Sequence, residues 1–268
     1  MAEMKFATVG GVVLHYTVEG LPAGVPLVFI NSLGSDLRIW DKLTPNFAED
    51  FPIIRYDLRG HGLSDCPPGP YTIRDHANDL AGLLKHLKVT QALLIGISVG
   101  GMIALDYAAA NPHSVRALIL SDTGAKIGTT ESWNERIAAV RQRGLDQMAE
   151  TILARWFTPT FSEQHPAGYR GYYNMLTRMP VAGYIATCEA LRDADLREAV
   201  GRITTKSLVL GGAEDLSTPP DLGRELAAAL PDAHFELIEK AAHLPCIEQP
   251  EVMAAKINRF LRSSREPS

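Results

Sequence analysis

A serine with a glycine two positions away on either side is the clearest chemical signal in the chain. The motif runs Gly96-Ile97-Ser98-Val99-Gly100 and follows an apolar run of strand length. A serine at a sharp turn from a strand into a helix is exposed at the strand's end, and glycine neighbours let the strand and the helix approach closely. The N-terminus of the helix also favours a developing negative charge. We therefore predict that Ser98 is a nucleophile.

A serine hydroxyl is a weak nucleophile, so the chain must also supply a base and a carboxylate that orients the base. The chain has eight histidines, and His243 lies just past the last predicted strand, at the carboxyl end of the predicted sheet. His61 lies in a glycine-rich loop ahead of the serine, where we predict a structural turn residue. His243 is therefore the predicted base.

The acid should also follow a strand, because the carboxyl ends of parallel strands meet at one edge of a sheet. Asp215 comes shortly after the apolar run Lys206 to Gly211. The resulting order of serine, aspartate and histidine is the one found with this type of serine turn. Glu214 is adjacent but would point elsewhere, whereas Asp122 ends another strand and stays an alternative. We predict Asp215 as the acid.

A serine that attacks a carbonyl group also needs N–H groups that stabilise the resulting oxyanion. The N–H of Val99 directly follows the serine, and a second donor is expected in the loop Asn31-Ser32-Leu33-Gly34. We predict the N–H of Leu33 as that donor, with the Ser32 hydroxyl as a further substrate contact. One such donor typically lowers a barrier by about 3 kcal/mol.

The elements that must position these residues alternate between strands and helices. Near-continuous runs of Val, Ile and Leu predict strands buried on both faces of a mostly parallel α/β sheet, with helices on both faces. The first two runs predict an antiparallel hairpin through Gly10 and Gly11, and the last run predicts an edge strand. The predicted strands are Lys5 to Ala7, Val12 to Val18, Pro26 to Asn31, Pro52 to Asp57, Ala92 to Ile97, Val115 to Ser121, Lys206 to Gly211 and His234 to Glu239. The predicted helices are Arg38 to Ala48, Thr72 to Leu87, Val99 to Ala110, Asp221 to Leu230 and Glu251 to Arg262.

Residues 125–200 break this alternation, because they carry helical periodicity without a convincing strand. The segments 131–143, 145–157 and 182–192 are amphipathic, and Trp133, Ile137 and Val140 share one helix face. We predict a core formed by residues 1–124 and 201–268, and a helical cap formed by residues 125–200 that covers the carboxyl edge of the sheet. The cap segment has nine basic and nine acidic residues, so the net charge of -5 belongs to the core.

Composition excludes several classes of protein. A chain of 268 residues with 46% hydrophobic and 21% charged residues is typical of a globular protein. It has no apolar run of about 20 residues and no secretory signal at its start, which predicts a cytoplasmic protein without a membrane partner. The net charge of -5 argues against a nucleic-acid partner. Cys66, Cys188 and Cys246 lack metal or redox spacing, so we expect free thiols and no metal.

The segment Asp57-Leu58-Arg59-Gly60-His61-Gly62-Leu63-Ser64 is similar to a loop motif of the α/β-hydrolase superfamily. Together with the serine turn, Asp215 and His243, it makes the chain resemble this superfamily over nearly its full length. The resemblance implies an α/β-hydrolase fold, with an eight-stranded, mostly parallel sheet, helices on both faces and an inserted helical cap. It also implies that no cofactor is needed. It is specific for the fold and weak for the substrate.

Three stretches narrow the resemblance to 3-oxoadipate enol-lactonases, which act in aromatic catabolism on the β-ketoadipate pathway. These stretches are the loop Asn31 to Gly34 followed by Trp40-Asp41, the cap stretches 126–137 and 155–159, and the segment Asp215 to Pro220 with its paired prolines. The resemblance implies a cytoplasmic serine esterase that opens 3-oxoadipate enol-lactone to 3-oxoadipate through an acyl-enzyme. Asp122 stands where an uncharged residue is expected in that family, so it must point away from an anionic substrate or weaken the assignment.

The substrate of such an enzyme is a small anion, so the pocket needs a positive or hydrogen-bonding group. We predict Arg136 for the substrate's carboxylate and Trp133 as an apolar wall. A general carboxylesterase or perhydrolase and a carbon-carbon bond hydrolase remain alternatives on the same triad. A ligand receptor that retains the triad is the alternative from another class. The sequence leaves a homo-oligomer open.

Overall fold

The computed structural model describes residues 3–263 and contains one eight-stranded sheet. The strand order is β1-β2-β4-β3-β5-β6-β7-β8, and the strands are parallel except where β2 pairs with β1 and β4. The predicted α/β fold is confirmed, including the antiparallel hairpin β1–β2 and the edge position of β8. The strands are β1 (Lys5–Val9), β2 (Val12–Gly20), β3 (Leu27–Ile30), β4 (Pro52–Tyr56), β5 (Ala92–Ile97), β6 (Val115–Ser121), β7 (Ser207–Gly212) and β8 (Ala233–Ile238).

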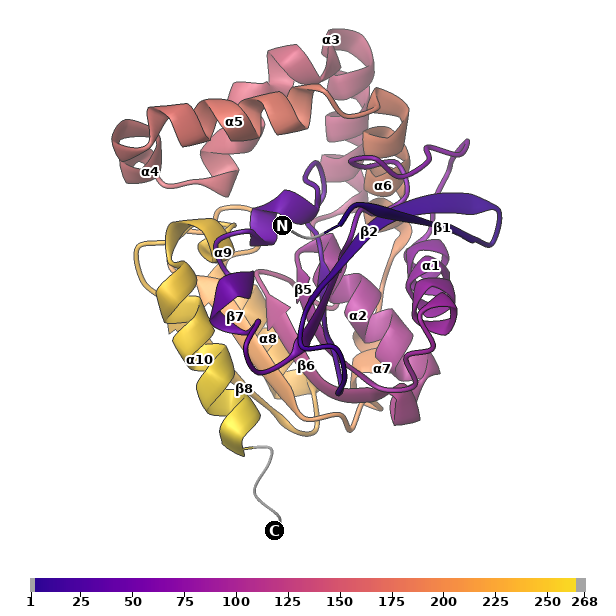
Figure 1. The fold of residues 1–268 in the computed structure, drawn as a ribbon. Coiled ribbons are helices and arrows are strands. Elements are labelled where there is room, and N and C mark those ends of the chain that lie inside the picture. Colours follow the sequence, from indigo (N-terminus) through magenta and orange to yellow (C-terminus); the bar gives the residue numbers. More distant parts are fainter. Residues whose placement is uncertain (1–2, 264–268) are drawn as a thin grey trace.

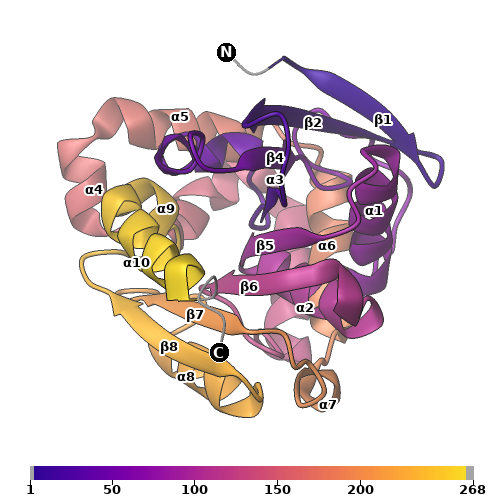
Figure 2. The ribbon, with the colours of Figure 1, turned by 60° about the horizontal axis from the view of Figure 1, so that its bottom comes forward.

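Helices cover both faces of the sheet (Figures 1 and 2). Helices α1 (Ile73–His86), α2 (Val99–Ala110) and α8 (Pro220–Ala229) lie on one face, and α10 (Pro250–Ser263) lies on the other. Every residue of β3 and β5 is buried, which explains why these strands consist of apolar runs rather than alternating patterns. None of the described helices is long and apolar enough to cross a membrane.

Five helices lie between β6 and β7 in the chain. They are α3 (Thr130–Trp156), α4 (Pro159–Gln164), α5 (Pro166–Thr177), α6 (Val181–Asp193) and α7 (Arg197–Val200). Figure 1 shows α3 to α6 as a separate layer over one end of the sheet. The short helix α7 instead packs against α2 and α8, far from that layer. The part that covers the sheet therefore ends with α6, and we use "cap" for α3 to α6.

Helix α3 is interrupted at Gly144, which has φ +74° and ψ 170°. The two amphipathic segments identified in the sequence, 131–143 and 145–157, meet at this residue. Glycine adopts a positive φ without steric cost, so the chain can change direction here inside an otherwise helical segment. On the N-terminal part of α3, Ile137 and Val140 are buried and Trp133 is half-buried, as the shared helix face predicted.

The cap touches the core through a backbone contact between two glycines. A Cβ added to Gly183, in α6, would lie 2.3 Å from the carbonyl oxygen of Gly60. A Cβ added to Gly60 would lie 2.7 Å from the Cα of Gly183. Because no larger side chain fits at either position, these glycines fix how closely α6 approaches the core loop.

The helix predicted for Arg38 to Ala48 is wrong. The structure has two short 3-10 helices there, η1 (Leu37–Trp40) and η2 (Thr44–Asn46). Pro45 has no N–H to donate to the preceding turn, so a continuous α-helix would lose a hydrogen bond and gain a clash. The segment instead buries Trp40, whose indole N–H donates to Asn31 Oδ1 at 2.8 Å.

Candidate active site

The candidate nucleophile Ser98 sits at the sharp turn that the sequence predicted. Strand β5 ends at Ile97, α2 begins at Val99, and Ser98 has φ +58°. A Cβ on Gly96 would lie 2.3 Å from the carbonyl oxygen of Gly100, and one on Gly100 would lie 2.2 Å from the carbonyl oxygen of Ile30. Both glycines are therefore required for strand and helix to meet. The strained backbone of Ser98 is of the kind that proteins retain where function needs it.

The candidate acid and base are joined by a direct hydrogen bond. His243 Nδ1 lies 2.8 Å from Asp215 Oδ2, and both side chains are buried. Asp215 follows β7 and His243 follows β8, so parallel strand ends bring together residues that are 28 positions apart. This bond leaves Nε2 of His243 as the ring nitrogen available to Ser98, since both residues line the same cavity.

Several hydrogen-bond donors stabilise Asp215 as a carboxylate. Its Oδ1 accepts from the N–H groups of Ser217 and Thr218, and its Oδ2 accepts from the Thr218 hydroxyl. Burial acts to raise the pKa of Asp215, but His243 and these donors outweigh burial and hold that pKa below its ordinary value. An ionised acid at this position orients the imidazole and stabilises its protonated form.

The two alternative acids lie elsewhere. Glu214 is exposed to solvent. Asp122 is buried, and its Oδ1 accepts the N–H of Gly212 at 2.7 Å. It does not belong to the described residues that line the cavity. Ligand atoms of Asp122, Asp215 and His243 lie within 4.8 Å of one another, a spacing that a metal ion could use, but Asp215 and His243 are bonded directly to each other.

The alternative histidine, His61, shapes the loop that carries a candidate oxyanion donor. It is buried, and its Nε2 accepts the N–H of Gly34 at 3.1 Å while Nδ1 lies 3.0 Å from the carbonyl oxygen of Arg59. Burial lowers the pKa of His61 below its ordinary value, so the neutral ring that accepts from Gly34 is favoured. Within the described part of the chain, the N–H groups of Leu33 and Val99 have no hydrogen-bond partner, as free oxyanion donors require.

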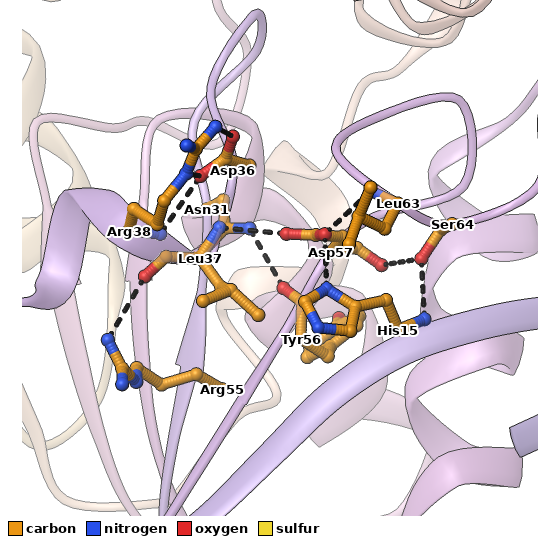
Figure 3. Close-up of polar contacts among 10 residues, drawn as sticks. All are labelled: His15, Asn31, Asp36, Leu37, Arg38, Arg55, Tyr56, Asp57, Leu63 and Ser64. Carbon is orange, nitrogen blue, oxygen red and sulfur yellow. Dashed lines mark hydrogen bonds and ion pairs between the residues drawn. The ribbon is translucent and has the colours of Figure 1, made fainter. Parts of the chain in front are cut away.

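Figure 3 shows how the same loop is tied to the core through Asp57. This carboxylate accepts the N–H groups of Leu37 and Leu63, each at 2.8 Å, and lies 2.7 Å from His15 Nδ1. Nearby, Asn31 donates to the carbonyl oxygen of Tyr56 at 2.8 Å. Because the loops that follow β3 and β4 share these bonds, the core holds the loop that carries Leu33 in place.

A cavity of about 400 Å³ opens between the core and the cap. From the core it is lined by Ser98, His243 and the loop residues Ser32 and Leu33, which the sequence had predicted as site residues. The cap supplies most of the remaining wall, so the candidate nucleophile faces a space that the cap borders. Ile127, in the loop before α3, also lines the cavity, and the cap residues in this wall include Trp133, Arg136, Met148, Ile152, Arg155, Trp156 and Tyr184.

Trp133 and Arg136, the predicted substrate contacts, both line the cavity. The Trp133 indole N–H donates to the carbonyl oxygen of Ile127 at 2.7 Å, which fixes the ring as a wall. Arg136 donates to the hydroxyl of Tyr184 at 3.1 Å. Among the described residues Arg136 has no carboxylate within ion-pair distance, so its charge is not neutralised by the protein.

Sequence reasoning missed Arg155 and Thr218. Arg155 lines the cavity from the end of α3 and donates to the carbonyl oxygen of Leu216 at 3.2 Å. It lies in one of the cap stretches that carried the resemblance, but no role was assigned to it. Thr218 bonds Asp215 and lies 3.3 Å from His243 Nδ1. It lies in the segment Asp215 to Pro220 that also carried the resemblance, but no role was assigned to it.

The fold and the site together define a class of hydrolase, in which a serine at a strand-to-helix turn faces a histidine and an aspartate from later strands. The family described as alpha/beta hydrolase fold matches residues 25–250. The chain belongs to this family.

Within the family, the chain is similar to enol-lactonases. It is 37% identical to 3-oxoadipate enol-lactonase 2 of Acinetobacter baylyi, over 95% of each chain. It is 31% identical to 3-oxoadipate enol-lactonase 1 of the same organism, over 94% of each chain. The crystal structure of the enol-lactonase from Burkholderia xenovorans LB400 matches with a TM-score of 0.94 and 34% identity, over 96% of this chain and all of that one.

Proposed function

We propose that the protein is a serine hydrolase that opens 3-oxoadipate enol-lactone to 3-oxoadipate. The observation that carries this proposal is a single cavity lined by Ser98, by the hydrogen-bonded His243 and by two arginines, Arg136 and Arg155. Such a cavity suits a small ester or lactone that bears a negative charge. The likeness to enol-lactonases in both sequence and structure supports the same choice of substrate.

In the first half of the proposed reaction, His243 Nε2 takes the hydroxyl proton of Ser98 as the serine oxygen bonds to the lactone carbonyl carbon. The N–H groups of Leu33 and Val99 stabilise the resulting oxyanion. The bond between that carbon and the ring oxygen then breaks, and the imidazolium returns its proton to the enol oxygen. An enol leaves more readily than an ordinary alcohol and goes on to form the ketone.

In the second half, water attacks the acyl-enzyme formed on Ser98. His243 takes one proton from the water. As the tetrahedral intermediate collapses, the imidazolium returns a proton to the Ser98 oxygen, and the second carboxyl group of the product is released. Asp215 stays ionised throughout and stabilises the imidazolium in each half. Both halves use the same base and the same donors.

The carboxylate that the substrate already carries is proposed to bind Arg136, with Arg155 as a second cation and Trp133 as the apolar wall. Neither guanidinium has a carboxylate partner among the described residues. A charge that the protein leaves unpaired beside a cavity favours an anionic ligand. Cations in the cap also explain how a protein with a net charge of -5 would take up an anion.

We further propose that the insertion of residues 125–200 selects the substrate through its cap helices α3 to α6, while residues 1–124 and 201–268 supply the chemistry. A cytoplasmic location is proposed as well. The three cysteines Cys66, Cys188 and Cys246 are free thiols in the structure, and free thiols are typical of a reducing compartment.

One assay tests the proposal: the loss of enol-lactone absorbance with wild type, Ser98→Ala and His243→Ala. We expect sustained turnover by the wild type and almost none by either variant. No loss of lactone with the wild type would contradict the proposed substrate. A neutral aryl ester, peracid formation from hydrogen peroxide and a carbon-carbon bond substrate, run in parallel, would then identify a carboxylesterase, a perhydrolase or a carbon-carbon bond hydrolase.

The same assay separates an enzyme from a receptor that retains the triad. An enzyme releases many equivalents of product for each protein chain. A receptor would release at most one equivalent and leave a stable adduct on Ser98, which intact-protein mass spectrometry would detect.

A further inference from the structure

Asp122 is a buried carboxyl group that the proposed reaction does not use. It is 1% exposed, it directly follows β6, and its backbone is held at φ +48°. Its Oδ1 accepts the N–H of Gly212, and its Oδ2 lies 2.5 Å from the Ser121 hydroxyl oxygen. Because Asp122 does not line the cavity, it can affect the reaction only through its neighbours.

The groups that face Asp122 come from four elements. Ser121 is on β6, Asp215 follows β7, His243 follows β8, and Cys246 is in the short helix α9 (Pro245–Glu248). No lysine or arginine among the described residues pairs with Asp122. Two carboxyl groups therefore share one buried space with a single histidine. Two like charges so placed repel each other strongly, and such pairs retain one proton between them.

The number of donors decides which carboxyl group keeps the negative charge. Asp215 accepts from two N–H groups, from the Thr218 hydroxyl and from His243. Asp122 has one N–H donor and one hydroxyl that can also act as an acceptor. The charge is therefore better stabilised on Asp215, which leaves Asp122 as the neutral acid.

We propose that Asp122 is a positioning residue, a neutral carboxylic acid that lies beside the ionised Asp215 and holds the triad acid against His243. This rests on the proposed serine-hydrolase function of Ser98, His243 and Asp215. Burial, and after it the charge of Asp215, raise the pKa of Asp122 well above its ordinary value, whereas the pKa of Asp215 is lowered. Opposite shifts in two neighbouring acids are expected when the pair carries one charge.

The first test is thermal unfolding of the full chain at several pH values, for wild type and Asp122→Asn. A carboxyl group whose pKa is higher in the folded than in the unfolded state binds more protons when folded, so its stability contribution falls as pH rises above about 4. Asparagine mimics the neutral acid and has no proton to lose. We therefore expect the Tm of Asp122→Asn, relative to the Tm of wild type, to rise by roughly 3 °C for each pH unit between about pH 4 and 7.

A Tm difference that does not change with pH would mean that Asp122 is ionised in the folded protein, which would overturn the proposal. Asp57→Asn is the matched control, because Asp57 is a buried carboxylate with N–H donors on both oxygens. We expect Asp57→Asn to lower the Tm, because an amide offers one acceptor oxygen where the carboxylate accepts N–H groups on both oxygens. These measurements need no substrate. They therefore decide whether Asp122 is neutral in the folded protein even if the proposed function fails.

The second test is the pH profile of kcat/KM on any substrate that the wild type turns over. If Asp122 is neutral, Asp122→Asn leaves the acid-limb midpoint within about 0.3 pH unit of wild type, whereas removal of a charge would lower it by about one unit or more. Asp122→Ala should reduce kcat by about 10- to 100-fold, and Asp122→Asn should recover most of that loss. A lowered midpoint, or no recovery, would overturn the positioning role. If Asp122→Ala does not fold, the acid-limb midpoint and the Tm of Asp122→Asn still test the proposal.

Discussion

The two walls of the cavity differ in how their polar groups are held. On the core side, Asp215 and His243 are bonded to each other, and Asp215 accepts three further hydrogen bonds from Ser217 and Thr218. On the cap side, Arg136 and Arg155 each contact one neutral oxygen atom. The core wall fixes its groups in a single arrangement, as a reaction requires. The cap wall leaves its two guanidinium groups without a carboxylate partner among the described residues, so their charge is available to a ligand.

The largest expected effect comes from the core wall. Ser98→Ala should lower kcat by about 10⁴-fold or more, because no other group can form the acyl-enzyme. Ser162→Ala, a serine in the cap helix α4, is the matched control and should keep wild-type kcat. The measurement is lactone loss under single- and multiple-turnover conditions. If Ser98→Ala were active, the core wall would not carry the reaction through Ser98.

Asp215→Asn should lower kcat by about 10³- to 10⁴-fold, because an amide no longer selects the imidazole tautomer that serves Ser98. The low pKa of Asp215 also predicts a pH effect on stability. A carboxyl group whose folded pKa is depressed stabilises the fold above about pH 4 and loses that contribution as pH falls further. Chemical denaturation across this range should therefore show a steeper loss for wild type than for Asp215→Asn. Equal acid sensitivity would show that Asp215 is not the stabilised carboxylate.

On the cap wall, Arg136→Ala should raise KM for the anionic lactone by about tenfold, with a much smaller change for a neutral aryl ester. Arg155→Ala should act in the same direction. If both guanidiniums bind the same carboxylate, the double variant should depart from the sum of the single effects in free energy. Equal changes in KM for the lactone and the neutral ester would show that Arg136 and Arg155 do not bind the substrate's carboxylate.

The smallest expected effect on catalysis comes from the contact between Gly183 in α6 and Gly60 in the core. Gly183→Ala places a methyl group 2.3 Å from the carbonyl oxygen of Gly60, so α6 must move away from the core. We expect a loss of about 1–3 kcal/mol in the free energy of unfolding and a rise of about threefold in KM, with kcat nearly kept. Gly171→Ala, in α5 with open space around it, is the control. A large fall in kcat would show that the cap also positions the reacting groups.

The sequence predicted the core wall better than the cap wall, and particular residues show why. Ser98, Asp215 and His243 each follow a predicted strand, and the rule that parallel strand ends meet at one edge places them together. Arg155 lies on an amphipathic helix, where many arginines face solvent, and its sequence neighbours do not reveal that it faces a cavity. The wrong helix at Arg38 to Ala48 came from an apolar pattern that gave too little weight to Pro45.

By itself, the sequence determined the eight strands, the turn at Ser98 and the order of the candidate triad, because these depend on local patterns of apolar residues and glycines. Only the tertiary structure decided that Asp215 rather than Asp122 bonds His243, since both carboxyl groups follow strands at the same edge. It also placed Arg155 in the cavity and α7 against the core. The orientation of a side chain and the placement of a helix depend on contacts with residues far away in the sequence. Local sequence patterns do not specify those contacts.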